Sequence, residues 1–254
     1  MHALFAVGLN TFKETIRNQA VYLVLLFVAL LIGLSISFGD WSVFARLQVI
    51  QDFGLAAMSI SGLLVSVFIG VGMLGKEISS KTVYHVLTHP LARPQFIIGK
   101  FGGLLAVLVL NYLLMTVCFF AALCLMGGQV TWPLMSAIVC IGIEMAVIIS
   151  AALFFSTFTS PILAALFSIA FYCAGHLNDL LSVQYIAKDW TALTGIVRVL
   201  YYVLPNLEHF NIRDHVVYNC ALPHGYTALC AAYGGLYVAL FLILSCVIFQ
   251  KKDL

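Results

Sequence analysis

A single carboxylate stands inside a long apolar stretch of the chain. Glu144 is the only charged residue well within the run from 132 to 158, which is long enough to cross a bilayer. A carboxylate in hydrocarbon is costly, so it must face protein or a water-filled cavity. Glu144 either lines a transport path or gate or has a structural role. In the structural case it is hydrogen-bonded to Ser150, to Asn111 or to a bridging water, or it lies near the outer end of its span.

Two further ionisable residues lie near the end of the next apolar run, residues 162–180. His176 and Asp179 are candidates, with Glu144, for a path or gate, and capping of a helix end is the alternative. An intramembrane enzyme needs paired catalytic groups at matching depth, which Glu144 alone does not supply. We therefore predict no catalytic residue.

Residues Gly70 to Lys76 match the spacing GxxxxGK, with which phosphate-binding loops begin. Such loops continue with Ser or Thr, which reaches magnesium, but here Glu77 follows, and its carboxylate would repel phosphate. The match also follows an apolar run instead of a strand. We interpret it as a span rich in small residues that ends in a cationic anchor, and we expect no nucleotide site in this chain.

Histidines gather at two places, and neither has the spacing of a known metal site. His85 and His89 are four residues apart, so a helix would place both on one face, but further ligands are missing. The second group precedes the last apolar run and comprises His209, His215, Cys220 and His224. Soft ligands without a recognisable spacing do not define a site. We therefore predict no metal site.

The composition indicates a membrane protein. Of 254 residues, 63% are hydrophobic and 9% are charged, whereas soluble domains have about 25% charged residues. Lipid is the expected surrounding of such a chain. The seven cysteines include no CxxC pair and are interpreted as small buried hydrophobic residues. Lys13, Glu14 and Arg17 make the first residues unlike a cleavable signal peptide.

Six apolar runs can each span a bilayer, so we predict an all-α integral membrane protein with a single transmembrane domain, residues 1–254. The predicted spans are residues 20–38, 53–74, 101–126, 132–158, 162–180 and 226–249. Residues 3–18 have apolar side chains at helical spacing, which predicts an amphipathic helix in the membrane interface, with a frayed lead-in as the alternative.

The segments between the spans differ in character. Asp40, Arg46 and Asp52 indicate a polar loop, whereas Gly127-Gly128-Gln129 and Thr159-Ser160-Pro161 indicate tight breaks. The longest segment, residues 181–225, is amphipathic. We expect it to form short helices that lie on the membrane and are broken at its prolines, Pro205 and Pro223.

Six spans place both termini on one side, and Lys and Arg residues decide which side that is. The side of the termini has eight of them: Lys13, Arg17, Lys76, Lys81, Arg93, Lys100, Lys251 and Lys252. The other side has four: Arg46, Lys188, Arg198 and Arg213. We therefore predict that the termini and residues 75–100 are cytoplasmic and that residues 181–225 lie outside.

Residues 75–100 form a polar segment held between two spans. The segment contains five charged residues, Lys76, Glu77, Lys81, Arg93 and Lys100, and two histidines. It is too closely tied to the membrane to fold independently, but it can form a short helix against the membrane surface. We interpret it as the contact through which a soluble partner moves the spans. A charged loop that only anchors two spans is the alternative.

Several residues of this segment recur at a recognisable spacing: Glu77, Thr82, Leu87, Pro90, Arg93 and Gly99-Lys100. The pattern resembles the cytoplasmic coupling segment of ABC-2 type transporter permeases. It departs from that family at Lys81 and Ala92, where Gly and Ser are usual. The span count, the sidedness and the N-terminal interfacial helix are also similar. Residues 204–211, LPNLEHFN, resemble the segment before the last span in the NosY-like subgroup.

This resemblance implies a permease subunit of an ATP-binding cassette transporter in the inner membrane, paired with a second, identical permease subunit. It implies a substrate moved by export, or a conformational change passed across the membrane. ATP and Mg would bind a separate ATPase subunit, so this chain would be no enzyme and would hold no cofactor. The expected ATPase contacts are Glu77, Ser80, Lys81, Thr82, Tyr84, His85, Pro90, Arg93 and Lys100.

Membrane lipid and an extracytoplasmic accessory protein are further expected partners, whereas nucleic acid is not. The expected contacts of the accessory protein are Pro205, Asn206, Glu208 and Phe210. The alternative function is an ATP-independent membrane anchor or assembly factor that recruits a cytoplasmic protein through residues 75–100.

Overall fold

The computed structural model describes residues 2–17, 46–79, 93–177, 204–218 and 225–251, together with residues 33 and 223. Every regular element within these residues is a helix, which confirms the predicted all-α class. The elements with more than one turn are α1 (His2–Ile16), α3 (Arg46–Ser79), α5 (Arg93–Leu125), α6 (Trp132–Phe158), α7 (Pro161–His176), η1 (Leu207–Phe210), α10 (Arg213–Val217) and α11 (Tyr226–Lys251).

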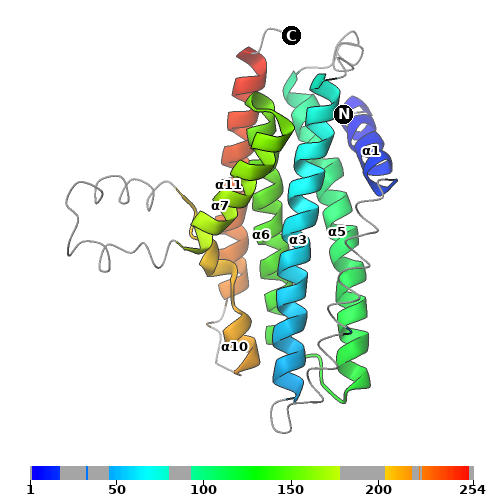
Figure 1. Ribbon diagram of the computed structural model, residues 1–254, viewed down its shortest axis with the longest axis vertical. Coiled ribbons are helices and arrows are strands. Elements are labelled where there is room, and N and C mark those ends of the chain that lie inside the picture. The colour runs from blue at the N-terminus through cyan, green and yellow to red at the C-terminus, as the bar shows by residue number, and fades with distance from the viewer. Residues whose placement is uncertain are drawn as a thin grey trace, which may run out of the picture.

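The long helices α3, α5, α6 and α11 run side by side along the long axis of the molecule, and the shorter α7 lies beside them (Figure 1). The start of α1, the end of α11 and the ends of α3 and α5 that flank residues 80–92 all lie at the same end of the bundle (Figure 1). This arrangement agrees with the prediction that the termini and the polar segment share one side of the membrane.

Four helices are long and apolar enough to cross a bilayer. These stretches are Arg46–Gly72, Pro94–Leu125, Trp132–Phe158 and Tyr226–Lys251, and α7 is a shorter apolar helix. The fourth and sixth predicted spans therefore correspond closely to α6 and α11. The first predicted span, residues 20–38, lies outside the described residues apart from residue 33, so the count of six stays a prediction.

Both α3 and α5 extend beyond their predicted spans. The predicted polar loop is wrong for Arg46 and Asp52, because both residues belong to α3. The reason is that tertiary packing continues past the apolar run, with Ile50 fully buried at 0% exposure. At the other end, α3 continues to Ser79 and α5 begins at Arg93, so that only residues 80–92 of the polar segment lie between the two helices.

The predicted break after α5 is confirmed as a helix C-cap. Gly127 has a φ of 79°, the left-handed conformation that glycine adopts without steric cost. The N–H of Gly128 donates to the carbonyl of Leu123 at 2.9 Å, and that of Gly127 to Cys124 at 3.0 Å. These are the two hydrogen bonds of a Schellman motif. The break before α7 is also confirmed, with Pro161 in the first turn after an extended Ser160.

Helix α1 packs closely against α5 through a contact between backbones. A Cβ atom added to Gly103 would lie 2.5 Å from the carbonyl oxygen of Gly8 and 2.7 Å from Cβ of Thr11. One added to Gly8 would lie 3.2 Å from the carbonyl oxygen of Gly99. Small residues thus allow the two helices to approach, as they do in membrane helix pairs. The predicted amphipathic helix is therefore present and is fixed to the bundle.

The described part of the outer segment, residues 204–218, packs into the bundle and does not simply lie on its surface. Leu207 and Phe210 of η1 are fully buried at 0% exposure. Two glycines make room for them. A Cβ added to Gly175 of α7 would collide with Leu207, and one added to Gly234 of α11 would collide with Ile143 and come close to Phe210. The expectation of helices on the membrane surface is therefore wrong for η1, which lies against α6 and α7.

Candidate functional site

Glu144 lies near the middle of its membrane-spanning helix. It is 12 residues from Trp132 and 14 from Phe158, the ends of α6, which corresponds to about 18 and 21 Å along the helix. Its side chain is buried, at 2% exposure. The alternative that Glu144 lies near the outer end of its span is therefore wrong.

The partner of Glu144 is His176, which ends α7. Nε2 of His176 lies 2.8 Å from Oε1 of Glu144. The two direct partners considered from the sequence are not the ones used. Ser150 donates to the backbone carbonyl of Val147 at 2.7 Å, and the buried Asn111 side chain has no hydrogen-bond partner among the described residues. Among the described residues, His176 is the only titratable group that contacts the buried Glu144 carboxylate and can neutralise it.

The second ring nitrogen of His176 contacts the outer segment. Nδ1 lies 2.9 Å from Oε2 of Glu208 in η1. The other carboxylate oxygen of Glu208 accepts a hydrogen bond from Nδ2 of Asn211 at 2.7 Å, and its backbone N–H donates to Oδ1 of Asn206 at 3.0 Å. We call Glu144, His176 and Glu208 the Glu–His–Glu bridge. It joins α6, α7 and η1.

Neighbouring residues fix the bridge in place. The ring of Tyr172, one turn before His176, lies edge-on to the imidazole with 4.5 Å between centroids. The Tyr172 hydroxyl lies 3.3 Å from that of Ser59 in α3. On the outer side, the phenol oxygen of Tyr233 in α11 accepts from the backbone N–H of Asn206 at 3.0 Å. Helices distant in the sequence therefore position the three side chains.

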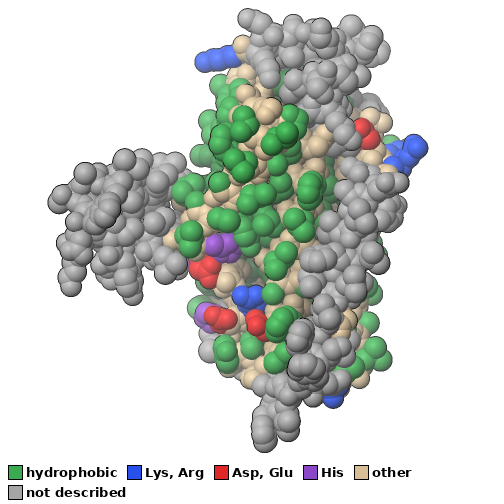
Figure 2. Space-filling model, in the orientation of Figure 1, with side chains coloured by type: hydrophobic (Ala, Val, Ile, Leu, Met, Phe, Trp, Pro, Cys, Tyr) green, Lys and Arg blue, Asp and Glu red, His purple; other side chains and the backbone are tan. Residues whose placement is uncertain are grey.

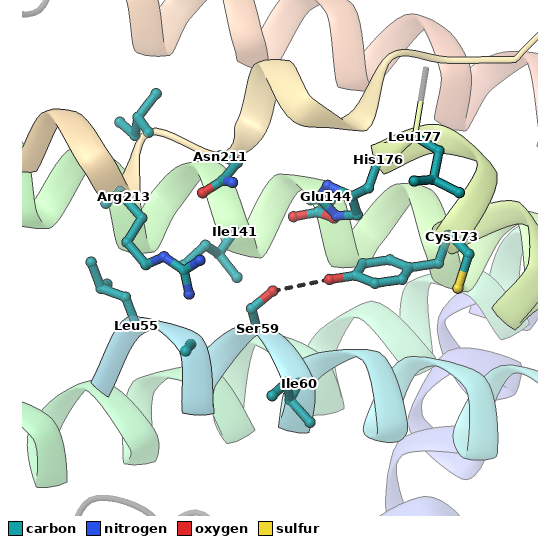
Figure 3. Close-up of a pocket in the computed structure, with 14 residues that line it drawn as sticks. Leu55, Ser59, Ile60, Ile141, Glu144, Cys173, His176, Leu177, Asn211 and Arg213 are labelled. Atoms are coloured by element: carbon teal, nitrogen blue, oxygen red, sulfur yellow. Dashed lines mark hydrogen bonds and ion pairs between the residues drawn. The ribbon is translucent and has the colours of Figure 1, made fainter. Parts of the chain in front are cut away.

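A cavity of about 460 Å³ adjoins the bridge between α3, α6, α7 and the start of α10. Its polar lining consists of Ser59, Glu144, Tyr172, His176, Asn211 and Arg213. Figure 3 shows the guanidinium of Arg213 reaching from α10 towards α3 and pointing into this space. Nε of Arg213 lies 3.1 Å from Oδ1 of Asp52 in α3. The cavity thus has mostly apolar walls and a few polar side chains, which lie at the level of the middle of α6.

Charged and histidine side chains gather on the face of the molecule shown in Figure 2, below a broad hydrophobic surface. The sequence is apolar over most of α7, and Ile162, Leu166 and Ile169 are exposed there, as expected for a surface in contact with lipid or with another apolar helix. The site therefore interrupts a surface that is otherwise suited to the membrane.

The bridge can hold and move protons, and it can bind polar groups. An imidazole between two carboxylates can donate from both nitrogens or accept on one of them. Within the described residues no group of three or more His, Cys, Asp or Glu could hold a metal ion. Cys220 and His224, from the second histidine group, lie outside those residues.

The sequence model of the family described as "ABC-2 family transporter protein" matches residues 5–254. The chain belongs to the ABC-2 transporter family. It is thus an integral membrane permease component of an ABC transporter, a kind of protein that associates with an ATPase and is generally not catalytic. No curated protein matches the chain.

The structure of this ABC-2 protein places some of the predicted ATPase contacts. Glu77 belongs to the last turns of α3, and Arg93 is the first residue of α5. Lys100 is buried at 1% exposure, with Nζ 5.3 Å from the centroid of the Phe96 ring, so its ammonium group is inside the bundle. The remaining predicted contacts, residues 80–90, lie outside the described residues, as does Asp179 of the predicted gate. The ATPase contact stays a prediction for the whole set.

The four predicted contacts of an outer accessory protein occupy different environments in the ABC-2 protein. Pro205 and Phe210 are buried. Asn206 caps η1, and Glu208 belongs to the bridge. Contact with an outer protein stays a prediction, while the structure shows that Glu208 also has a partner within the chain.

Sequence reasoning found Glu144 and His176 but not their contact. It also missed Asn211, Tyr172 and the ion pair between Asp52 and Arg213. One signal was available, because opposite charges in neighbouring spans are expected to pair when they lie at one depth. The depth of His176 could not be read from the sequence, since α7 is short and ends partway along the bundle (Figure 1).

We expect Gly175→Ala to loosen the contact between α7 and η1. The new Cβ would lie 2.5 Å from Cγ of Leu207, and such overpacking destabilises by about 1–3 kcal/mol. Gly142→Ala in α6 is the matched control, because its Cβ would meet no atom within 4 Å and the change favours the helix by up to about 1 kcal/mol. The measurement is the unfolding midpoint in mixed detergent micelles. Equal midpoints for the two variants would contradict the packing described.

Proposed function

We propose that this chain is the permease subunit of an exporter in the inner membrane, with both termini in the cytoplasm. Two identical chains form the path, and a separate ATPase subunit docks on residues 75–100. ATP binding and hydrolysis on that subunit move the permease helices. The Glu–His–Glu bridge and its cavity form the outer gate of each permease chain.

The observation that supports a permease best is the polar bridge at the middle of the bundle. An anchor needs only apolar helices, and an ionisable group at this depth is costly. Here Glu144 is buried, bound to His176 at 2.8 Å, and lies on a cavity of about 460 Å³. A costly group beside an open space is typical of a membrane site through which a ligand or ion passes.

Helix α3 provides a physical connection between the two regions. It is continuous from Arg46 to Ser79 and therefore contains both Glu77 and the cavity residues Leu55 and Ser59. Its 34 residues correspond to about 51 Å of helix. Because a helix moves as a stiff body, displacement of its cytoplasmic end by an ATPase would also displace the wall of the cavity. This supports coupling of ATP hydrolysis to the outer gate.

The second candidate is a membrane anchor that recruits a cytoplasmic protein through residues 75–100 without ATP. The polar segment fits both functions. The bridge and the cavity favour the permease, because recruitment on the cytoplasmic surface does not use a polar site in the middle of the bilayer.

The experiment that tests the proposal is co-purification of the tagged chain from its own membranes in mild detergent, followed by an ATPase assay. We expect a stoichiometric ATPase with the wild-type chain. We expect Glu77→Ala and Arg93→Ala to reduce its amount by about tenfold or more, as for residues at the centre of an interface.

Gln95→Ala is the matched control, because Gln95 is exposed in the first turn of α5 but is not among the predicted contacts. It should retain the ATPase at the wild-type level. Absence of any ATPase from the wild-type preparation in several detergents would remove the energy source of the proposed transporter, and the anchor would then be the better explanation.

A further inference from the structure

The Glu–His–Glu bridge connects the bilayer centre to the outer segment through one imidazole ring. Nε2 contacts Glu144 at 2.8 Å, and Nδ1 contacts Glu208 at 2.9 Å. Both distances suit charge-assisted hydrogen bonds. A ring held in this way can accept a proton on one nitrogen and release another from the opposite nitrogen. The geometry is therefore that of a proton relay.

The number of protons in the bridge can be counted from its hydrogen bonds. With both carboxylates ionised, both ring nitrogens must donate, so His176 is an imidazolium and the bridge has a formal charge of about −1. If the proton on Nε2 moves to Glu144, the ring becomes neutral, Glu144 donates to Nε2, and the formal charge is unchanged. Both contacts remain satisfied in either arrangement, so this transfer breaks no hydrogen bond.

Exposure increases along the bridge. The side chain of Glu144 is 2% exposed, that of His176 is 22% exposed and that of Glu208 is 35% exposed. Glu144 and His176 also line the cavity, together with the amide of Asn211. Glu208, the most exposed of the three, is therefore the entry point for a proton from outside, and the ring of His176 connects it to the buried Glu144.

Other titratable or charged groups face the bridge from every element packed around it. They are Asp52 of α3 with its partner Arg213 of α10, Tyr112 of α5, Cys140 of α6, Tyr172 and Cys173 of α7, and Tyr233 of α11. Arg213 and Asp52 neutralise one another at 3.1 Å. The tyrosines and cysteines are neutral in water below about pH 8. The bridge differs from these groups because its imidazole joins two carboxyl groups by hydrogen bonds.

We propose that the Glu–His–Glu bridge is a proton-binding site through which Glu144 exchanges protons with the outer side. The relay starts from a bridge with one proton fewer, in which both carboxylates are ionised and the neutral ring has its hydrogen on Nε2. A proton taken up by Glu208 passes to Nδ1 of His176, and the proton on Nε2 passes to Glu144, which leaves the ring neutral with its hydrogen on Nδ1. No electrons are transferred and no covalent bond other than those to hydrogen changes. Return of the proton along the same route restores the ring to its first tautomer.

Binding of one further proton weakens the attachment of η1. With one further proton the bridge has no net charge, because an imidazolium ring then faces one ionised carboxylate and one neutral carboxyl group. One of the two charge-assisted contacts of His176 therefore becomes a weaker hydrogen bond. Proton binding from outside would therefore favour release of η1 from α7. The proton is thus a ligand that biases the outer gate.

This inference deepens the proposed function and depends on it only for the statement that residues 204–218 face outside. The proton site itself can be tested on the purified chain without an ATPase. A failed co-purification would therefore leave the inference standing, and a missing proton site would leave the coupling to an ATPase standing.

The experiment is infrared difference spectroscopy of the chain in phosphatidylcholine nanodiscs, between about pH 8 and pH 5. We expect a carbonyl band of a protonated, buried carboxyl group that is absent from Glu144→Gln. Asp52→Asn is the matched control, because it removes a carboxylate outside the bridge that pairs with the cavity residue Arg213, and it should retain the band. Exchange of this carboxyl proton for deuterium should slow by about 100-fold or more in His176→Gln, the factor expected when a positioned proton-transfer group is lost.

Glu208→Gln provides a second test should His176→Gln not fold, and it should also slow the exchange because it interrupts the outer end of the relay. The proposal is overturned if no band depends on Glu144. It is also overturned if deuterium exchange at Glu144 is equally fast in the wild-type chain and in the folded variants of His176 or Glu208.

Discussion

His176→Leu is expected to destabilise the folded chain by about 3–5 kcal/mol, the cost of removing one partner from a buried ion pair. The substitution leaves Glu144 at 2% exposure without its contact at 2.8 Å. Glu144→Leu should cost less, because it removes the buried carboxylate and leaves His176 paired with the more exposed Glu208. The measurement is the unfolding midpoint in mixed detergent micelles.

The double variant Glu144→Leu/His176→Leu tests the physical reason for this order. It should be more stable than His176→Leu alone, since a buried pair replaced by apolar residues is often neutral in stability. Ser150→Ala is the control on the same helix, because Ser150 bonds only to its own helix, at the carbonyl of Val147. Additive effects of the two single substitutions would show that Glu144 and His176 do not interact in the membrane.

Gly103→Val is expected to separate α1 from α5. The branched side chain would begin with a Cβ placed 2.5 Å from a backbone oxygen of Gly8 and 2.7 Å from Thr11. Backbone atoms cannot rotate away as a side-chain tip can, so the helices must move apart, and overpacking of this kind costs about 1–3 kcal/mol or more. We expect a lower unfolding midpoint and faster proteolysis within residues 2–17.

Gly102→Val is the matched control for this prediction. It is the neighbouring residue of the same helix, and a Cβ there would meet no atom within 4 Å. Both variants change the intrinsic helix propensity equally, so the difference between them reports the contact with α1. Equal proteolysis of residues 2–17 in the two variants would contradict the close packing of these helices.

The site lies near the middle of the bundle, whereas the end of α3 that contains Glu77 lies at one end of it. Glu77 lies near the end of α3, and Ser59, which contacts Tyr172 at 3.3 Å, lies five turns earlier on the same helix. One continuous helix therefore connects the predicted coupling segment to the cavity.

Membrane class and helix positions could be predicted because they follow from local composition. Long apolar runs define α6 and α11, whose predicted bounds are nearly those observed. Gly127-Gly128 and Pro161 mark helix ends because their backbone requirements are local. The ends of α3 and α5 were predicted less well. A helix does not stop where the apolar residues stop, and Arg46, Glu77 and Arg93 are all helical.

A carboxylate in an apolar span cannot be left in lipid, so the position of Glu144 in the chain already implies a partner. That the partner is His176, and that Glu208 completes the bridge, follows from the packed helices alone. The three residues are separated by 32 positions at each step. Their meeting depends on the short α7 and on Gly175, which lets η1 enter the bundle beside it. Such a contact follows from how the helices pack, and no local pattern in the chain specifies it.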